Sequence, residues 1–234
     1  SGVMWSEPVK EAMLAHNPTM LLIDTFSSSE AIGMGSSVSA GDSAEKTAHF
    51  SLGPGCMVFD DDGKPVAAGS GERGRVAVPG RVPIAYYKDP VKSADTFIEH
   101  DGIRYSMPGD YATIEADGTI TLLGRGSVCI NTGGEKVFPE EVEEALKTDP
   151  GVADAVVVGV PDEKFGEAIT AVVEMLPGAP LDEAGLISHV RTHLAHFKSP
   201  KRVLAIDTIG RAPNGKVDYK RLKAYAIDEL GIDA

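Results

Sequence analysis

The sequence predicts an α+β protein in which an antiparallel, β-rich and barrel-like subdomain is followed by a small α+β domain, with a hinge between them. Three observations support this prediction. Between residues 55 and 124, short apolar runs alternate with Gly and Asp turns, which is typical of antiparallel strands. After Gly124, two long apolar runs stand among segments of helical periodicity. A length of 234 residues is enough for one large domain or two modest ones.

The first part of the chain begins with a short helix and then contains mainly strands. The helix is expected over 8–16 and an apolar strand over 20–23, whereas the Gly- and Ser-rich stretch 33–41 predicts a loop. Further strands are expected at 56–59, 73–78, 111–115 and 119–123. Asp117-Gly118, between the last two, is a strong signal for a hairpin with a two-residue turn. These short strands and tight turns favour an antiparallel sheet.

The second part of the chain mixes helices with strands. Proline and acids open the segment 139–147 and a lysine ends it, as the helix dipole favours. Another helix is expected where apolar residues repeat at helical spacing, namely at Leu186, Ile187, Val190, Leu194 and Phe197. Strands are expected at 155–160, 168–175 and 202–206, with a last helix over 218–230. We therefore predict two domains, 1–124 and 125–234.

Composition and charge argue against several classes of function. The formal net charge of −13 argues against a nucleic-acid partner, because phosphate binding needs a concentrated basic surface. No apolar run is long enough for a transmembrane segment, and the first residues lack a signal-peptide pattern. The two cysteines, Cys56 and Cys129, are far apart and lack metal-site spacing. Buried, reduced thiols in a cytoplasmic protein are therefore expected.

Two motif matches fail their structural tests. Gly69 to Gly74 fits the dinucleotide pattern G-x-G-x-x-G, but it precedes a strand and opens no helix, so a turn is expected. His189, His193 and His196 lie near one side of a predicted helix, and the first two have metal-ligand spacing. No glutamate follows His189 in the zinc-protease pattern, and the apolar stripe beside these residues already explains the helix. A solvated or half-buried histidine face is therefore expected.

Three other segments have both a structural and a functional interpretation. Gly109-Asp110 is by default a turn, and its carboxylate also suits the two hydroxyls of a ribose. Thr132-Gly133-Gly134-Glu135 is by default the N-terminal turn of the helix that follows, and a glycine pair also lets backbone approach a thin ligand. Lys216 lies in a loop rich in Pro, Asn and Gly, where most lysines are simply solvated.

Six segments, taken in order, resemble the sequence blocks of one superfamily. They are Phe26 to Glu30, Gly71 to Val76 with the stretch 80–97, Arg104 to Asp110, Gly124-Arg125 with Gly133 to Glu143, Val160 to Glu167, and Asn214-Gly215-Lys216. In this order they resemble the acyl- and aryl-CoA synthetase, adenylation-domain and luciferase superfamily, and most closely its fatty-acid–CoA ligases. The resemblance covers essentially the whole chain. It implies that 1–124 is the C-terminal part of a large nucleotide-binding domain and that 125–234 is a mobile small domain.

The resemblance implies an ATP-dependent, AMP-forming acid–thiol ligase of lipid metabolism. A fatty or otherwise bulky acid attacks the α-phosphate of ATP, which gives acyl-AMP and pyrophosphate, and the thiol of CoA then displaces AMP. Lys216 would be catalytic, stabilising the charge that spreads over the α-phosphate in the transition state. Glu30 would also be catalytic, as the residue that binds Mg²⁺, with Ser29 as a neighbouring hydroxyl in place of the usual Thr.

The resemblance also assigns residues to the nucleotide. Phe26 would stack on adenine beside the backbone of Gly2-Val3, Asp110 would accept both ribose hydroxyls, and Arg125 would contact the ribose or a phosphate. One departure from the superfamily lies beside this site. Pro108 stands where Thr is usual before Gly-Asp, which removes a hydroxyl and an N–H.

In the second half-reaction the resemblance implies a movement of the small domain. It would turn about the hinge after Gly124, so that Gly133 and Gly134 line the pantetheine path of CoA and Lys216 withdraws. The hinge residue is commonly Asp or Lys in the superfamily, but it is Ser127 here, behind Gly126. Glycine permits the change of φ and ψ that a pivot needs, whereas any charge interaction that set its limits is lost.

The superfamily's Ser/Thr/Gly-rich phosphate loop and most of its acyl pocket precede the first residue of this sequence. We therefore expect a C-terminal portion of a longer enzyme, whose partners are a small-molecule acid, ATP, CoA and the missing N-terminal part of its own chain. Residues 1–234 alone are expected not to adenylate an acid. Two alternatives stay open. One is a ligase that loads acyl-AMP onto a carrier protein, although the stretch 32–54 leaves little room for the insertion common in such relatives. The other is a noncatalytic binding module that retains the fold.

Overall fold

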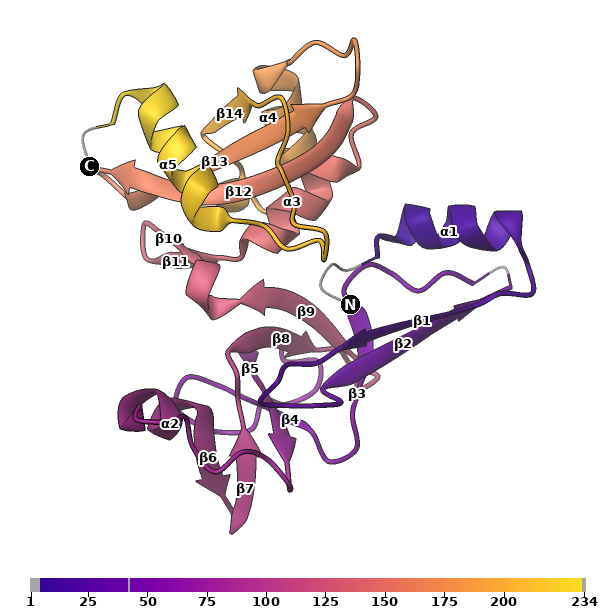
Figure 1. The fold of residues 1–234 in the computed structure, drawn as a ribbon, viewed down its shortest axis with the longest axis vertical. Helices are drawn as coiled ribbons and strands as arrows, with labels where there is room; N and C mark the ends of the chain where they lie inside the picture. Colours follow the sequence, from indigo (N-terminus) through magenta and orange to yellow (C-terminus); the bar gives the residue numbers. More distant parts are fainter. Residues whose placement is uncertain (1–4, 42, 233–234) are drawn as a thin grey trace. The chain divides into compact units, whose positions relative to one another are not determined.

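The structure, a computed structural model, describes residues 5–41 and 43–232 and divides into two compact units, Ser1–Leu123 and Gly124–Ala234. Both units combine strands with helices, so the predicted α+β class is confirmed (Figure 1). The roles predicted for the two domains, as part of a nucleotide-binding domain and as a mobile small domain, stay predictions. The backbone of Gly2-Val3, predicted to lie beside adenine, is outside the described residues.

The first unit is built on a nine-stranded sheet. Its strands are β1 (Leu21–Phe26), β2 (Gly35–Ala40), β3 (His49–Leu52), β4 (Met57–Phe59), β5 (Arg73–Pro79), β6 (Phe97–His100), β7 (Ile103–Ser106), β8 (Asp110–Ile114) and β9 (Ile120–Arg125), the last of which extends into the second unit. They follow the order β1-β2-β3-β9-β8-β5-β7-β6, with β4 beside β5. The registered pairs are all antiparallel, as predicted.

Two helices, α1 (Glu7–His16) and α2 (Pro90–Thr96), accompany this sheet. The helix predicted over 8–16 is thus confirmed. It is anchored by Lys10, whose side chain is only 1% exposed. The Lys10 ammonium donates to the Glu45 carbonyl at 3.3 Å and lies 3.9 Å from the Asp24 carboxylate on β1. A buried ammonium needs such partners, because it has lost its hydration.

The core of the first unit draws a buried apolar residue from each of five strands. Phe50, Val58, Val76, Ala112 and Ile120, from β3, β4, β5, β8 and β9, are each at most 1% exposed. Because side chains alternate between the two faces of a strand, these residues fix which face of each strand is turned inward.

The loop predicted over 33–41 is wrong. β2 occupies most of it and pairs with β1 from Leu21↔Ala40 to Phe26↔Gly35. Along β2, Ser39 is buried whereas Val38 is 53% exposed, so the strand alternates but turns small polar residues inward. Gly and Ser have low strand propensity, and here the pairing with β1 outweighs it.

The hairpin predicted at Asp117-Gly118 joins β8 to β9 and is confirmed, with a loop one residue longer than expected. The Glu115 amide donates to the Thr119 carbonyl at 2.8 Å, and the Gly118 amide donates to the Glu115 carbonyl at 3.0 Å. Gly118 has a φ of 86°. This is the left-handed position of a three-residue loop with a bulge.

The second unit is built on a five-stranded sheet. Its strands are β10 (Ile130–Thr132), β11 (Glu135–Val137), β12 (Val152–Asp162), β13 (Gly166–Met175) and β14 (Arg202–Ala205), and its helices are α3 (Pro139–Lys147), α4 (Glu183–His193) and α5 (Tyr219–Leu230). Two 3₁₀ turns, η1 (Gly126–Val128) and η2 (His196–Lys198), complete it. The strand order is β11-β10-β13-β12, with β14 parallel to β13.

Helices cover both faces of this sheet (Figure 1). Val157 on β12 belongs to the core cluster that contains Leu146 of α3 and Val190 of α4. Its neighbour Val156 belongs to the cluster that contains Leu222 of α5. Adjacent residues of a strand point to opposite faces, so an almost continuous apolar strand is what a sheet covered on both sides requires.

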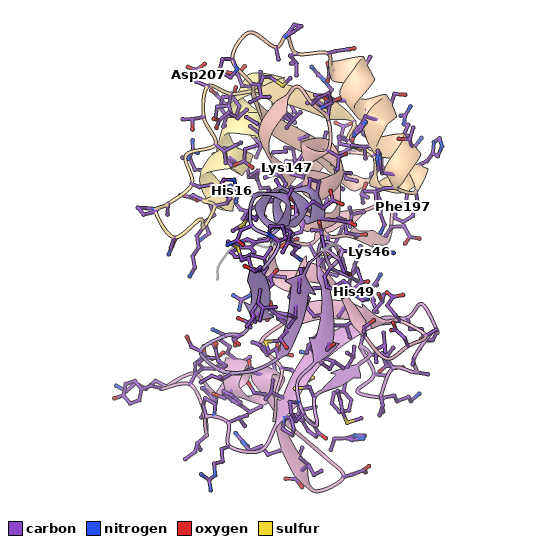
Figure 2. The ribbon with its side chains drawn as sticks, turned by 90° about the vertical axis from the view of Figure 1, so that its right-hand side faces the viewer. His16, Lys46, His49, Lys147, Phe197 and Asp207 are labelled. Carbon is purple, nitrogen blue, oxygen red and sulfur yellow. The ribbon has the colours of Figure 1, made fainter. Side chains whose placement is uncertain are left out.

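The elements predicted for the second unit are confirmed except at one helix end. The predicted segments 139–147, 155–160, 168–175, 202–206 and 218–230 coincide with α3, β12, β13, β14 and α5 apart from one to three residues at their ends. The helix predicted through Phe197 instead ends at His193, and Leu194 is extended with φ −129° and ψ 162°. Leu194 still packs on the core, whereas Phe197 is 47% exposed (Figure 2). Apolar spacing therefore continued past the end of the helix.

Within the described part of the chain, every helix is too short or too polar to span a bilayer. Cys56 and Cys129 are free thiols, each partly buried.

Candidate functional site

The aromatic candidate of the first unit, Phe26, is the last residue of β1. Its ring lies 5.0 Å from the ring of Phe50, centroid to centroid, and it is half-buried. The strand partner of Phe26 is Gly35, where a Cβ atom would lie 2.3 Å from the ring. Only glycine therefore lets the ring lie across this pair, and the ring is held against the sheet.

A tight bend after β1 carries Ser29 and Glu30. The Ser28 amide donates to the Ala31 carbonyl at 2.9 Å, and the Ala31 amide donates back to Ser28 at 3.2 Å. The Ser27 hydroxyl accepts from the Gly33 amide at 3.1 Å. The bend leaves Ser29 exposed and Glu30 half-buried. A carboxylate and a hydroxyl thus stand within two residues on a backbone that is fixed locally.

The Glu30 carboxylate has a partner that sequence reasoning missed. The Tyr86 hydroxyl donates to its Oε1 atom at 2.6 Å. Tyr86 is held in turn, because its amide donates to the Ser93 hydroxyl at 2.9 Å and its ring lies 5.4 Å from the Phe97 ring. A hydrogen bond to an ionised group is among the stronger ones, so Tyr86 orients this carboxylate. Tyr86 lay in a block that the resemblance marked, but nothing local pointed to Glu30.

Asp110 opens β8 directly after Gly109, whose φ of 98° requires a glycine. The sheet order puts three strands, β2, β3 and β9, between β1 and β8. Strand order therefore does not bring Asp110 next to Phe26, whereas Phe26, Ser29 and Glu30 are neighbours along the chain.

In the second unit, Arg125 ends β9 and is exposed. Its amide donates to Oε1 of Glu140 at 3.4 Å. Gly124, before it, is buried with a φ of 132°, and a Cβ there would lie 2.2 Å from the Glu140 carboxylate. Glycine is thus required at 124 both by its backbone and by its neighbour. Ser127 lies in η1 and is exposed.

The Gly133-Gly134 pair is a hairpin turn, so the predicted N-terminal helix turn is wrong. Thr132 of β10 pairs with Glu135 of β11, and the two glycines have φ values of 59° and 87°. Positive φ at both central residues is the type I′ turn that two-residue hairpins prefer. The Gly133 amide donates to the Phe165 carbonyl at 2.9 Å, and both glycines are exposed. The turn is therefore a bare strip of backbone with a fixed conformation.

Lys216 is exposed on a closed turn. The Ala212 amide donates to the Lys216 carbonyl at 2.9 Å, and the Gly215 amide donates to the Ala212 carbonyl at 2.7 Å. The Lys216 amide donates to the Asn214 side chain at 3.2 Å. Among the described residues, the Lys216 ammonium makes neither a hydrogen bond nor an ion pair. The backbone of the turn is held by hydrogen bonds, and the Lys216 ammonium is exposed.

A buried polar cluster lies behind this turn and was not predicted. Glu143 of α3 is 4% exposed and accepts from the Val157 amide at 2.9 Å and from the Tyr219 hydroxyl at 3.1 Å. Burial raises the pKa of Glu143 to about 8, although the hydrogen bond from Val157 opposes this shift. Nearby, Arg211 pairs with Asp154. One signal was available: on a helix, position 143 lies on the same side as Leu146, which is apolar.

The three histidines do not gather round one point. His189 Nε2 lies 2.7 Å from the Thr148 hydroxyl and 3.1 Å from the Ala145 carbonyl, and His193 Nδ1 lies 2.9 Å from the His189 carbonyl. His196 is exposed in η2. In the part of the chain that the structure describes, no group of three or more His, Cys, Asp or Glu side chains could hold a metal.

The chain is similar to known proteins along nearly all of its length. Residues 141–216 match the AMP-binding enzyme C-terminal domain. The 3-oxocholest-4-en-26-oate–CoA ligase of Rhodococcus rhodochrous is 46% identical over 238 residues, which cover 99% of this chain and 41% of that ligase. The medium/long-chain-fatty-acid–CoA/3-oxocholest-4-en-26-oate–CoA ligase of Mycobacterium tuberculosis (strain ATCC 25618 / H37Rv) is also 46% identical, over 95% of this chain and 41% of its own length.

A solved structure shares the fold. ATP-bound MatB from Rhodopseudomonas palustris superposes with a TM-score of 0.68 at 33% identity, over 82% of this chain and 38% of that protein. The chain thus spans about two-fifths of the length of each of these relatives, and it matches their C-terminal part.

Proposed function

This chain belongs to the acyl-CoA synthetase superfamily of adenylate-forming enzymes, and we propose that the protein containing it is an AMP-forming ligase that joins a fatty or otherwise bulky lipid acid to CoA. The observation that carries the proposal is Lys216, an exposed ammonium on a turn closed by hydrogen bonds. The names of the relatives support CoA as acceptor and a fatty or steroid acid as substrate. The ATP bound to MatB supports the nucleotide.

In the first half-reaction a carboxylate oxygen of the acid attacks the α-phosphorus of ATP, and the bond to the bridging oxygen of pyrophosphate breaks. Negative charge spreads over the phosphoryl oxygens as this happens. The Lys216 ammonium stabilises that charge, and Phe26 and Asp110 hold the nucleoside by stacking on adenine and by accepting the ribose hydroxyls. Arg125 contacts the ribose or a phosphate.

The residues at 29 and 30 suit Mg²⁺, which prefers oxygen ligands from one or two carboxylates and otherwise keeps its waters. Glu30 supplies a carboxylate that Tyr86 orients at 2.6 Å, and Ser29 supplies an exposed hydroxyl. When bound, the ion would neutralise charge on the phosphates. Oriented ligands reduce the rearrangement that binding requires.

In the second half-reaction the thiol sulfur of CoA attacks the acyl carbonyl, and AMP leaves. The bare type I′ turn at Gly133-Gly134 supports a role in lining the narrow path of the pantetheine arm, since two residues without side chains let a thin ligand approach backbone. We infer a movement of the second unit about 124–127 between the two half-reactions, because motion about a hinge can complete one arrangement of an active site and then replace it.

A carrier protein in place of CoA is the main alternative. Carrier-loading relatives often have an insertion after the Glu30 block. Here β2 and β3 occupy residues 35–40 and 49–52, so the interval is already used by the sheet. This favours CoA. A noncatalytic module is the other alternative, and no observation favours it.

The proposal is tested on the full-length protein by measuring acid-dependent exchange of pyrophosphate into ATP and, separately, thioester formation with CoA. Lys216→Ala should lower the exchange rate by at least about 10²-fold, because it removes a charge that acts in the transition state. Lys220→Ala is the matched control, since Lys220 is also exposed but lies on α5. It should leave both rates unchanged.

Three outcomes would contradict the proposal. If the wild-type protein exchanged no pyrophosphate into ATP with any acid of a fatty and steroid panel, the adenylation step would be contradicted. Thioester formation with a phosphopantetheinyl carrier in preference to CoA would favour the carrier-loading ligase. Equal exchange in Lys216→Ala and Lys220→Ala would remove the role of Lys216.

A further inference from the structure

Arg211 joins the Lys216 turn to the central sheet of the second unit. Its guanidinium donates twice to the Asp154 carboxylate, from Nε to Oδ2 at 2.6 Å and from Nη2 to Oδ1 at 2.8 Å. Asp154 lies on β12 and also accepts from the Ala155 amide at 2.8 Å, so its carboxylate is fixed. Bidentate pairing holds the plane of a guanidinium as well as its position.

The same guanidinium has a third contact, and this one reaches the turn itself. Nη1 of Arg211 donates to the Gly215 carbonyl at 3.2 Å. This carbonyl belongs to the peptide unit that ends in the Lys216 amide. The Arg211 side chain thus links the backbone of Lys216 to β12. A lysine could not do the same, because a single ammonium cannot reproduce the planar fork of an arginine.

A second anchor lies on the other side of Lys216. Tyr219 opens α5, three residues later, and its hydroxyl donates to Oε1 of Glu143 at 3.1 Å and lies 3.3 Å from Oε2. Glu143 is buried on α3 and is held by the Val157 amide. The turn is therefore supported before and after Lys216 by groups that belong to β12 and α3.

Such support matters for a charge that must meet a transition state. A lysine side chain is long and flexible, and an error of about 1 Å in a reacting geometry can cost roughly 10²-fold in rate. Simple stabilisation of the fold would need only the Arg211–Asp154 pair. The contact to the Gly215 carbonyl serves the turn specifically.

We propose that Arg211 is a positioning residue for Lys216, which it holds through the Gly215 carbonyl, with Asp154 as its support on β12 and the Glu143–Tyr219 pair as the second anchor of the turn. This inference rests on the proposed function in one respect only, namely the role of Lys216 in the reaction.

The mechanical part is tested on the 234-residue chain by NMR-detected hydrogen exchange. In Arg211→Ala and Arg211→Lys the amides of Ala212 and Gly215, which close the turn, should exchange at least about tenfold faster. The matched control is Arg202, whose Nε donates to Glu183 at 2.9 Å in the same unit but away from the turn. Arg202→Ala and Arg202→Lys should leave both amides unchanged. Asp154→Asn provides a further test if Arg211→Ala does not fold.

The catalytic part is tested on the full-length protein. Arg211→Lys keeps a positive charge beside Asp154, so its thermal unfolding should stay close to that of the wild type. Its kcat for pyrophosphate exchange should still fall by about 10²-fold, with KM for ATP changed less than about threefold. A role in stability alone would not produce this division.

Two results would overturn the inference. One is an unchanged hydrogen-exchange rate of the Ala212 and Gly215 amides in both Arg211 variants. The other is faster hydrogen exchange of these amides together with an unaltered kcat for pyrophosphate exchange. An inactive wild-type protein would instead contradict the proposed function. This outcome would be distinguishable, because the difference in amide hydrogen exchange between the Arg211 and Arg202 variants would persist.

Discussion

Glu143 places a carboxyl group in the interior of the second unit, and the sequence indicated this only through its position on the same side of α3 as the apolar Leu146. In the sequence the four glutamates of α3 form one acidic segment near a helix N-terminus, although only Glu140 and Glu141 lie in its first turn. Only the structure distinguishes Glu143, because only Glu143 receives the Val157 amide and the Tyr219 hydroxyl. Four similar residues in the sequence thus have different physical roles.

We predict that Glu143 makes stability depend on pH. Burial raises its pKa to about 8 from an ordinary 4.5, so between these values the folded chain holds a proton that the unfolded chain releases. The stability contributed by this proton is complete below pH 4.5 and is lost as the pH rises through about 8. The free energy of unfolding of the wild type should therefore fall relative to Glu143→Gln, by up to about 1.4 kcal/mol per pH unit.

The measurement is denaturant unfolding of the 234-residue chain at several pH values from 5 to 9. Glu144→Gln is the matched control, because Glu144 is the next residue of the same helix but its side chain is 22% exposed and pairs with Lys147. Its pH profile should run parallel to that of the wild type. A Glu143→Gln profile that also runs parallel to the wild type would contradict the prediction.

At the scale of elements, the Gly133-Gly134 hairpin is the clearest case in which a local pattern had two structural interpretations. Thr-Gly-Gly-Glu before an acidic helix suits a helix start, and Gly-Gly between two short strands suits a type I′ turn. β11 is only three residues long, which is too short for an alternation of polar and apolar residues to predict a strand. Pairing of β10 with β13 at Thr132↔Gly166 decides the outcome, because it makes β10 a strand.

We predict that Gly133→Ala impairs the second half-reaction more than the first. The φ of 59° at this position costs an L-residue about 1–2 kcal/mol, and the added Cβ would lie 3.1 Å from the Phe165 ring. In the full-length protein, thioester formation from preformed acyl-AMP should slow by about tenfold or more. Pyrophosphate exchange should change less than about threefold.

The control for this variant is Gly118→Ala. Gly118 also lies in a hairpin, with a φ of 86° and no atom within 4 Å of an added Cβ, but in the first unit. It should cost similar stability and leave the ratio of the two half-reaction rates unchanged. Equal slowing of both half-reactions in Gly133→Ala would contradict a role in the path of CoA.

At the scale of the whole molecule, each of the two compact units has buried apolar clusters of its own, and in the second unit these clusters lie on both faces of the sheet. The two units also carry the residues proposed for the nucleoside, for Mg²⁺ and for the transition-state charge. Phosphoryl transfer, however, depends on holding the attacking and leaving oxygens in line about the reacting phosphorus. The superfamily's phosphate loop precedes the blocks that this sequence resembles.

We predict that the 234-residue chain folds but does not exchange pyrophosphate into ATP, whereas the full-length protein does. Without the phosphate loop, the effective concentration of a correctly oriented acid and ATP is lost, and this accounts for most of the rate. The check is an acid-dependent exchange assay on both proteins at equal concentration, with dispersed NMR spectra as proof that the shorter one is folded. Acid-dependent exchange by the shorter chain would contradict the prediction.

The sequence by itself determined the parts of this protein that local patterns encode. A proline and acids at one end and a lysine at the other located α3, and helical periodicity located α4 except for its end. Continuous apolar runs located β12 and β13, and the order of six short blocks identified the superfamily. Periodicity and the residues within each short block can be read from a single chain because they relate positions that are close in sequence.

Tertiary structure alone decided what depends on distant pairing. β2 became a strand because β1 pairs with it, and Gly133-Gly134 became a hairpin turn because β10, on one side of it, pairs with β13. The supports of the Lys216 turn join Arg211 to Asp154 across 57 positions and Tyr219 to Glu143 across 76. No local pattern records such contacts, since burial and hydrogen bonding across the fold, and not the spacing of residues, bring these groups together.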